Sequence, residues 1–78
     1  MNLAETVAAL ADAEHDQTQW YVRMVELETD LGRIVPDLTD QVEMAEALFR
    51  RYRQASAAWR AAVAEVERLA GEMDRAIR

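Results

Sequence analysis

The sequence predicts an all-α protein: a two-helix antiparallel hairpin, similar to a coiled coil, in one domain that spans residues 1–78. Two long segments, about residues 3–31 and 38–77, repeat apolar residues at alternating steps of three and four. This spacing keeps one apolar stripe along one side of a helix. Between the segments, residues 32–37 contain a glycine and the only proline, which favour a turn. Two helices alone give only a thin core, so we expect self-association or a partner to complete a helical bundle.

Residues 3–31 are expected to form the first helix. Asn2 can cap its first turn, and Glu5 follows three residues later, as in a capping box. Gly32 is suited to the left-handed residue that ends many helices, so we expect this helix to end near Leu31. Its stripe consists of Leu3, Val7, Leu10, Glu14, Gln17, Tyr21, Met24, Glu28 and Leu31, flanked by Ala13, Trp20, Leu27 and Ile34.

Residues 38–77 are expected to form the second helix, about 60 Å long at 1.5 Å per residue. Pro36 prevents the first helix from continuing, and Asp37 or Thr39 is the expected cap of the second. A second apolar row beside the stripe makes a face wide enough for more than one neighbour. The stripe is Leu38, Val42, Ala45, Phe49, Tyr52, Ser56, Trp59, Val63, Val66, Ala70, Met73 and Ile77, and the second row is Leu48, Ala55, Ala62, Leu69 and Ala76.

A turn at residues 32–37 pairs residues whose numbers sum to about 70, and this predicts two features. Polar residues interrupt both stripes at the same level, so we expect one buried hydrogen-bonded layer, formed by Glu14, Gln17, Tyr52 and Ser56. The first helix also runs out of residues opposite residue 67, which leaves the end of the second helix uncovered. We expect this uncovered stripe to be an interface, with a second copy as the first candidate; it consists of Leu69, Ala70, Met73 and Ile77.

Composition narrows the possible binding partners, cellular location and source of the protein. The net charge of -6 argues against nucleic-acid binding, because phosphate contacts supply most of that affinity. The chain has neither the uncharged run of about 18 residues that a membrane span needs nor a signal-like first segment, so we expect a cytoplasmic protein without membrane contact. Every basic residue is arginine and alanine is abundant, which indicates a GC-rich genome, such as that of an actinobacterium or one of its phages.

Two polar pairs have spacings that occur in metal sites. Asp12 and His15 resemble half of a carboxylate–histidine pair, but they lie on the outer side of the first helix. Glu43 and Glu46 resemble the paired acids with which helical nucleotide pyrophosphohydrolases hold magnesium, but the first helix has no acidic pair of that spacing. We therefore expect no metal, no cofactor, no small-molecule substrate and no catalytic residue. Magnesium-dependent nucleotide hydrolysis is kept as a third interpretation.

The two tryptophans, Trp20 and Trp59, complete the candidate interface. In a two-helix chain tryptophans pack across an oligomer or are presented to a partner, and we assign both to that role. The segment 49–77, with Trp59 in its middle, resembles the second helix of the small secreted (WXG-type) hairpins of type VII secretion systems. Those proteins carry Trp-x-Gly in the turn and Tyr-x-x-x-Asp/Glu after the second helix. Here Gly32 follows Leu31, and Ser56 stands four residues after Tyr52.

These observations favour a small non-enzymatic module for protein–protein interaction, an adaptor, scaffold or inhibitor that acts through its apolar helix faces. We expect it to form a homodimer, to bind another protein, or both, and to be carried by a phage or mobile element. The secreted type VII-like hairpin is the alternative interpretation.

Overall fold

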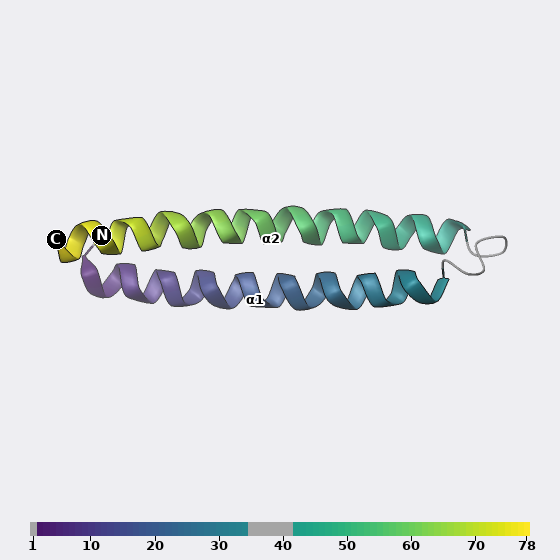
Figure 1. Cartoon of the computed structure of the whole chain (residues 1–78), viewed down its shortest axis with the longest axis horizontal. Coiled ribbons are helices and arrows are strands. Elements are labelled where there is room, and N and C mark those ends of the chain that lie inside the picture. The colour runs from purple at the N-terminus through teal and green to yellow at the C-terminus, as the bar shows by residue number, and fades with distance from the viewer. Residues whose placement is uncertain (1, 35–41) are drawn as a thin grey trace.

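The chain folds into two long helices that lie side by side and run in opposite directions (Figure 1). This computed structural model describes residues 2–34 and 42–78, which form α1 (Leu3–Ile34) and α2 (Val42–Ile77). The molecule measures 58 × 14 × 13 Å, and the start of α1 lies beside the end of α2. The predicted all-α helical hairpin is therefore confirmed, and the described residues contain no strand.

Asn2 caps the first turn of α1, as the sequence predicts. Its side-chain Oδ1 accepts a hydrogen bond of 2.8 Å from the backbone N–H of Glu5. Thr6 adds a second link, because its hydroxyl donates to the carbonyl oxygen of Asn2 at 2.9 Å. Unpaired backbone N–H groups are common to every helix start, and the Asn2 side chain satisfies one of them here.

The end of α1 differs from the expectation. The helix continues through Gly32 to Ile34, three residues beyond the expected end at Leu31, and no described glycine has a positive φ. Gly32 is thus an ordinary helical residue and not a left-handed cap. Packing explains the extension, because Leu31 and Ile34 are both buried and hold the last turn against α2. The expected start of the second helix at residue 38 and its caps Asp37 and Thr39 lie outside the described residues.

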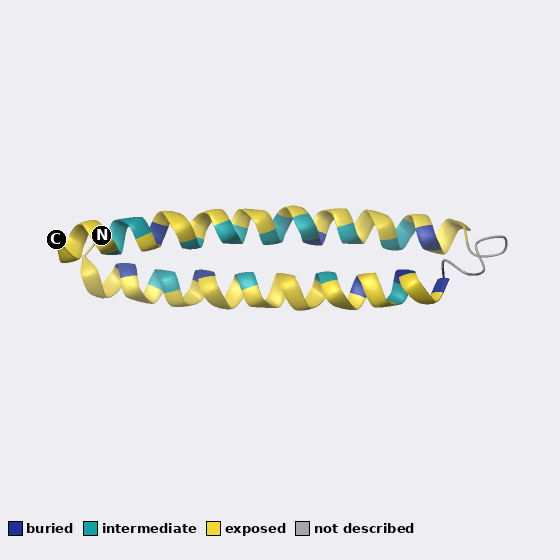
Figure 2. Ribbon diagram, in the orientation of Figure 1, coloured by how far each residue is buried: buried dark blue, intermediate teal, exposed yellow. Residues whose placement is uncertain are grey.

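The core is a narrow strip along the facing sides of the two helices (Figure 2). Leu27 and Leu69 are its most buried large side chains, each only 1% exposed. Most other positions in the strip are small, which lets the helices approach closely. On each helix one row of residues spaced by seven follows this strip, and we call these two rows the contact rows. They are Thr6, Ala13, Trp20, Leu27 and Ile34 on α1, and Leu48, Ala55, Ala62, Leu69 and Ala76 on α2.

On α1, the contact row differs from the predicted stripe. The sequence analysis treats Ala13 and Leu27 as flanking residues, whereas the structure buries both and leaves Val7 and Tyr21 of the predicted stripe exposed. The helix is rotated relative to the expectation because apolar residues occupy two adjacent rows of α1. Thr6 fits the buried row because its hydroxyl is already bonded to the backbone.

The pairing of the helices also differs from the expectation. Tyr21 packs on Trp59, and Tyr52 bonds to Glu28, and in both contacts the two residue numbers sum to 80. The expected sum of about 70 was therefore wrong by ten residues, which is a slide of about 15 Å along the helix axis. The later end of α1 moves the connection toward the C-terminus, but its three extra residues account for only part of this shift.

Candidate functional site

The candidate site is an exposed face on one side of the hairpin. On both helices the residues that directly follow the contact row form a second row, which we call the side row. The α2 side row is Val42, Phe49, Ser56, Val63, Ala70 and Ile77, and the α1 side row is Val7, Glu14, Tyr21 and Glu28. An antiparallel helix pair is related by an approximate two-fold axis perpendicular to the plane of the two helices. Both side rows are displaced in the same rotational sense, so they lie on the same side, and we call them together the broad face.

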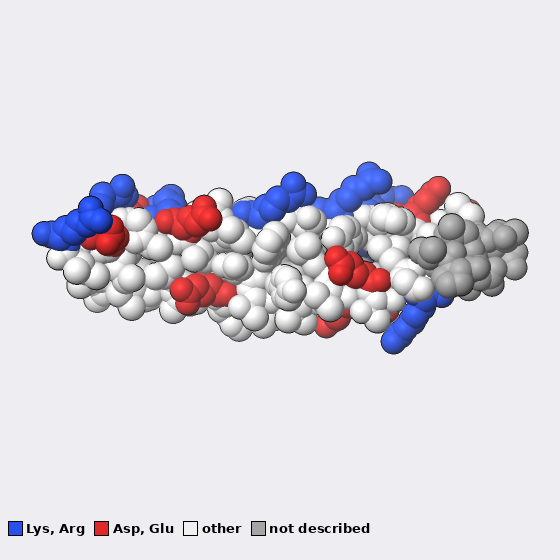
Figure 3. All heavy atoms as spheres, viewed as in Figure 1, with Lys and Arg blue, Asp and Glu red and all other residues white. Residues whose placement is uncertain are grey.

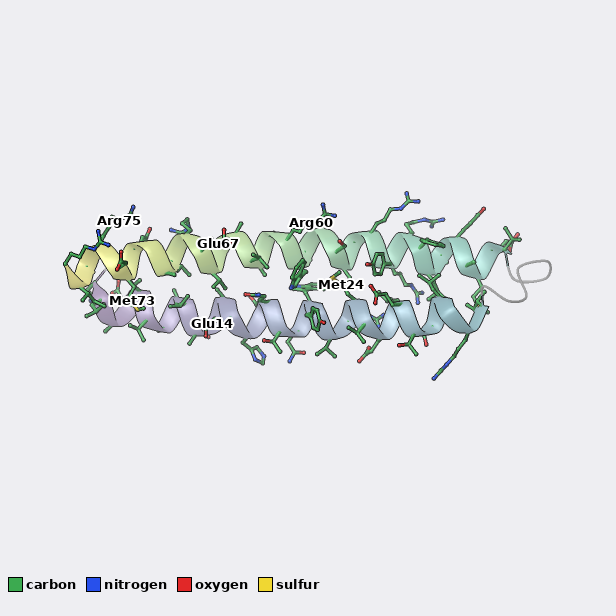
Figure 4. All side chains as sticks on the ribbon, viewed as in Figure 1. Glu14, Met24, Arg60, Glu67, Met73 and Arg75 are labelled. Carbon is green, nitrogen blue, oxygen red and sulfur yellow. The ribbon has the colours of Figure 1, made fainter. Side chains whose placement is uncertain are left out.

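Two contacts across the hairpin support this arrangement. The hydroxyl of Tyr52, beside the α2 side row, donates a hydrogen bond of 2.9 Å to Oε1 of Glu28 in the α1 side row. The ring centroids of Tyr21 and Trp59 lie 6.4 Å apart at an interplanar angle of 50°. Such a tilted arrangement is favourable for aromatic pairs. In Figure 4, Met24 points between the helices, whereas Arg60 lies on the outer edge of α2.

The α2 side row is uncharged over the whole length of the helix, although 31% of the chain is charged. Most of it is also accessible: Phe49 is 47% exposed, Val42 is 49% exposed and Ile77 is 68% exposed, while Ser56 and Val63 are half-buried. The α1 side row is mixed, because Tyr21 is 56% exposed but Glu14 and Glu28 are acids. In Figure 3 the arginines gather along the edge that α2 forms, and large uncharged areas separate the acids.

The bond between Tyr52 and Glu28 has an electrostatic consequence. A carboxylate that accepts this bond favours the neutral phenol, and it repels a phenolate. The hydrogen bond to Glu28 therefore raises the pKa of Tyr52 above its ordinary value of 10.0. The pair is the polar contact that links the two helices beside the broad face.

The predicted buried polar layer does not form. Glu14 is exposed, Gln17 is half-buried, and neither is hydrogen-bonded to Tyr52 or Ser56, all four being described residues. Tyr52 bonds to Glu28 instead, and the hydroxyl of Ser56 accepts a bond of 3.2 Å from Arg60 of the same helix. The prediction fails because the helices slide by about 15 Å, so Glu14 and Ser56 no longer lie at the same level.

The sequence predicts that the first helix does not reach the stripe at the end of α2, and this prediction is wrong. The first helix reaches this level, and Leu69 is buried within the chain beside Ala13, with which it lines one surface hollow. Met73 is half-buried, whereas Ala70 and Ile77 are exposed and belong to the α2 side row. An interface role for these last two residues stays a prediction.

The two predicted tryptophans are in different environments. Trp59 is half-buried and packs on Tyr21 of the same chain, so Tyr21 covers part of the Trp59 ring. Trp20 belongs to the contact row but is 41% exposed. The structure thus brings Trp59 to the broad face through Tyr21. Tyr21 and Phe49 are interface candidates that were not predicted from the sequence. Phe49 could have been found from its spacing of seven from the uncharged residues Val42 and Ser56, whereas Tyr21 lies between Glu14 and Glu28 at that spacing and carries no such signal.

Charged residues on the remaining surface pair locally. Arg68 bonds to Glu65 and to Glu72, with 2.7 Å between its Nη1 and Oε1 of Glu72, and the bond to Arg68 lowers the pKa of Glu65. All the ion pairs among the described residues join positions three or four apart on one helix. Such exposed pairs contribute little to stability.

The residues with metal-like spacing lie on the surface. Asp12, His15, Glu43 and Glu46 are all exposed, and Asp12 borders a surface hollow that Ala62 and Leu69 of α2 also line. Within residues 2–34 and 42–78, no three histidine, aspartate or glutamate side chains lie close enough together to hold a metal ion. In the same ranges, neither helix is sufficiently long and apolar to cross a membrane.

Comparison with known proteins identified no relative. No protein-family model matches this chain, and no curated protein or solved structure matches it either. The broad face therefore has to be interpreted from its own chemistry.

Proposed function

We propose that this chain is a small non-enzymatic module for protein–protein interaction, an adaptor, scaffold or inhibitor that binds helices of another chain through the broad face. The observation that supports the proposal is the α2 side row, which is uncharged and largely accessible from Val42 to Ile77. A solvent-facing row on a chain rich in charge normally carries charged residues, as the outer side of α2 does at Arg53 and Arg60.

The side chains on this face supply part of the free energy that binding needs. Fully burying one Val, Ile or Phe side chain contributes roughly 1.5–3 kcal/mol. Val42, Phe49 and Ile77 are about half exposed or more, and Val63 is half-buried. These four side chains therefore offer several kcal/mol before the entropic cost of association is subtracted. Phe49 is the largest of the four and is expected to be the main anchor, since aromatic residues dominate interface energies.

Affinity capture with matched variants tests the proposal. Phe49→Asp introduces a charge into the broad face, and Ala61→Asp introduces the same charge at an exposed position of α2 outside it. The tagged wild-type chain and the Ala61→Asp variant are expected to retain the same partner proteins from cells of the source organism. Phe49→Asp should lose them. If both variants retain the same proteins as the wild type, the broad face is not the binding surface and the proposal is wrong.

We infer a cytoplasmic setting for the module, and cell fractionation tests this inference. The secreted type VII-like hairpin is the second candidate, because two long antiparallel helices are the fold that this resemblance implies. It predicts that the chain accumulates in the culture medium of cells with a working type VII system and is retained in cells without one.

A further inference from the structure

We propose that the occupant of the broad face is a second copy of this chain, with the two α2 helices packed antiparallel along their side rows. This inference rests on the proposed function and specifies the partner of the same surface. The resulting dimer is a four-helix assembly with a two-fold axis. Each α2 packs against α1 of its own chain on one side and against α2 of the other copy on the adjacent side.

The surface area of the chain is consistent with a missing partner. A compact monomer of 8.9 kDa is expected to expose about 4,800 Å². The hairpin exposes 5753 Å², because an elongated chain with extents of 58 × 14 × 13 Å has little interior. The excess is about as large as the roughly 800 Å² that each partner buries in a stable interface.

The α2 side row is complementary to itself in size. If the row is paired with an antiparallel copy about its midpoint, between Ser56 and Val63, these two residues face each other. Phe49 then faces Ala70, and Val42 faces Ile77, so that each large side chain of the first two pairs meets a small one. A two-fold axis repeats every such contact, as an isologous interface requires. Interdigitation of large and small residues is what well-packed helix interfaces need.

Charge favours packing of α2 of the second copy against α2 of the first, and not against α1. The α1 side row carries Glu14 and Glu28, and packing these carboxylates against an apolar row would remove water from them without supplying a cation. The α2 side row carries no charge. Arg60 lies closest to the midpoint, but it is on the outer edge of α2 and its guanidinium turns back to the carbonyl and hydroxyl of Ser56.

Cysteine cross-linking tests the arrangement directly, because the chain has no cysteine of its own. Ser56→Cys and Val63→Cys face each other across the proposed dimer, so an oxidised equimolar mixture of the two variants should give a cross-linked heterodimer. Either variant alone should cross-link poorly, since the two copies of one position are offset by about 10 Å along the axis and a disulfide requires Cα atoms within about 7 Å. Efficient cross-linking of Ser56→Cys alone would show a parallel pair or an antiparallel pair centred on residue 56, and either result overturns the arrangement.

Sedimentation equilibrium of the purified chain tests the partner. The wild type and Ala61→Asp should sediment as dimers, and Phe49→Asp should dissociate with a dimer Kd at least about 30-fold higher, because each dimer loses the Phe49 anchor of both copies. Circular dichroism checks that Phe49→Asp remains helical, which its 47% exposure predicts. A wild type that remains monomeric at high concentration overturns the homodimer but leaves the proposed function standing if Phe49→Asp still abolishes capture of another protein.

Discussion

Replacing Leu69 by alanine tests how the two helices are aligned. Leu69 is 1% exposed, and its cover comes from α1 at the level of Ala13. With helices aligned so that residue numbers sum to about 70, Leu69 would lie beyond the end of α1 and would be exposed. The two alignments therefore predict very different losses of stability for the same truncation.

The expected loss follows from the burial of the side chain. Buried Leu→Ala substitutions cost about 2–5 kcal/mol, and the thin core here can partly collapse onto the cavity, so we expect about 2–3 kcal/mol. At roughly 0.05–0.15 kcal/mol per residue the whole domain is stable by about 4–12 kcal/mol. With a urea m-value near 1 kcal/mol per M for a domain of this size, the unfolding midpoint should fall by about 2 M.

Urea unfolding followed by circular dichroism measures this change at two protein concentrations, because association would add a concentration-dependent term. Val22→Ala is the matched control: its side chain is 46% exposed and lies outside the broad face, so the change should stay within about 0.5 kcal/mol. Leu27→Ala, equally buried near the other end of the hairpin, should resemble Leu69→Ala. If Leu69→Ala costs no more than Val22→Ala, α1 does not cover this end and the alignment described here is wrong.

Three further predictions concern local features. Asn2→Ala should lower the free energy of unfolding by about 0.5–2 kcal/mol, whereas Asn2→Ser, which keeps a capping oxygen, should leave urea unfolding nearly unchanged. Gly32→Ala should raise thermal stability, by about 0.5–1 kcal/mol, because Gly32 is helical and an added Cβ meets no atom within 4 Å; a loss of stability would instead indicate a left-handed cap. Ring-carbon NMR should show that the pKa of Tyr52 is raised and that Glu28→Gln lowers it, and an unchanged pKa in the variant would exclude the hydrogen bond as the cause. The stabilisation from this pair is complete below the unfolded pKa of 10.0 and disappears as the pH rises through the pKa of the folded state.

Local chemistry and periodicity were sufficient to predict the fold. The alternating three–four spacing predicts two helices and Pro36 predicts a break between them, while the cap at Asn2 depends only on its immediate neighbours. These features are local in sequence, so no knowledge of the tertiary structure was needed. The prediction of the hairpin and of its first cap was therefore correct.

The alignment of the helices could not be predicted in the same way. It depends on where α1 ends, and Gly32 fits equally well as a left-handed cap or as a helical residue. The burial of Leu31 and Ile34 against α2 decides between these, and that is a tertiary contact. The predicted cross-helix contacts, including the polar layer of Glu14 and Ser56, depended on this choice and on the expected turn at residues 32–37.

The rotation of α1 was missed for a related reason. Two adjacent rows of this helix contain apolar residues, and hydrophobicity alone does not say which row faces α2. The predicted stripe includes the row of Val7 and Tyr21, but the row with Ala13 and Leu27 allows closer helix approach and is the one buried. Of the broad face, only Ala70 and Ile77 were predicted to be uncovered, because the other residues lay in the stripes expected to face each other.

The alignment of the two helices also sets an order in which the hairpin can form. Ile34 and Ala45 are buried next to the connection, where the two helices are close in sequence, whereas Thr6 and Leu69 are buried where the two ends of the chain lie side by side. Closing a short loop costs less conformational entropy than closing a long one. Contacts between the two helices are therefore expected to form first beside the connection and then successively toward the termini. Leu69 is the last large side chain to be buried in this sequence of events. Leu69 therefore holds the terminal ends of the two helices together, and its loss would let this end of the hairpin open before the rest unfolds.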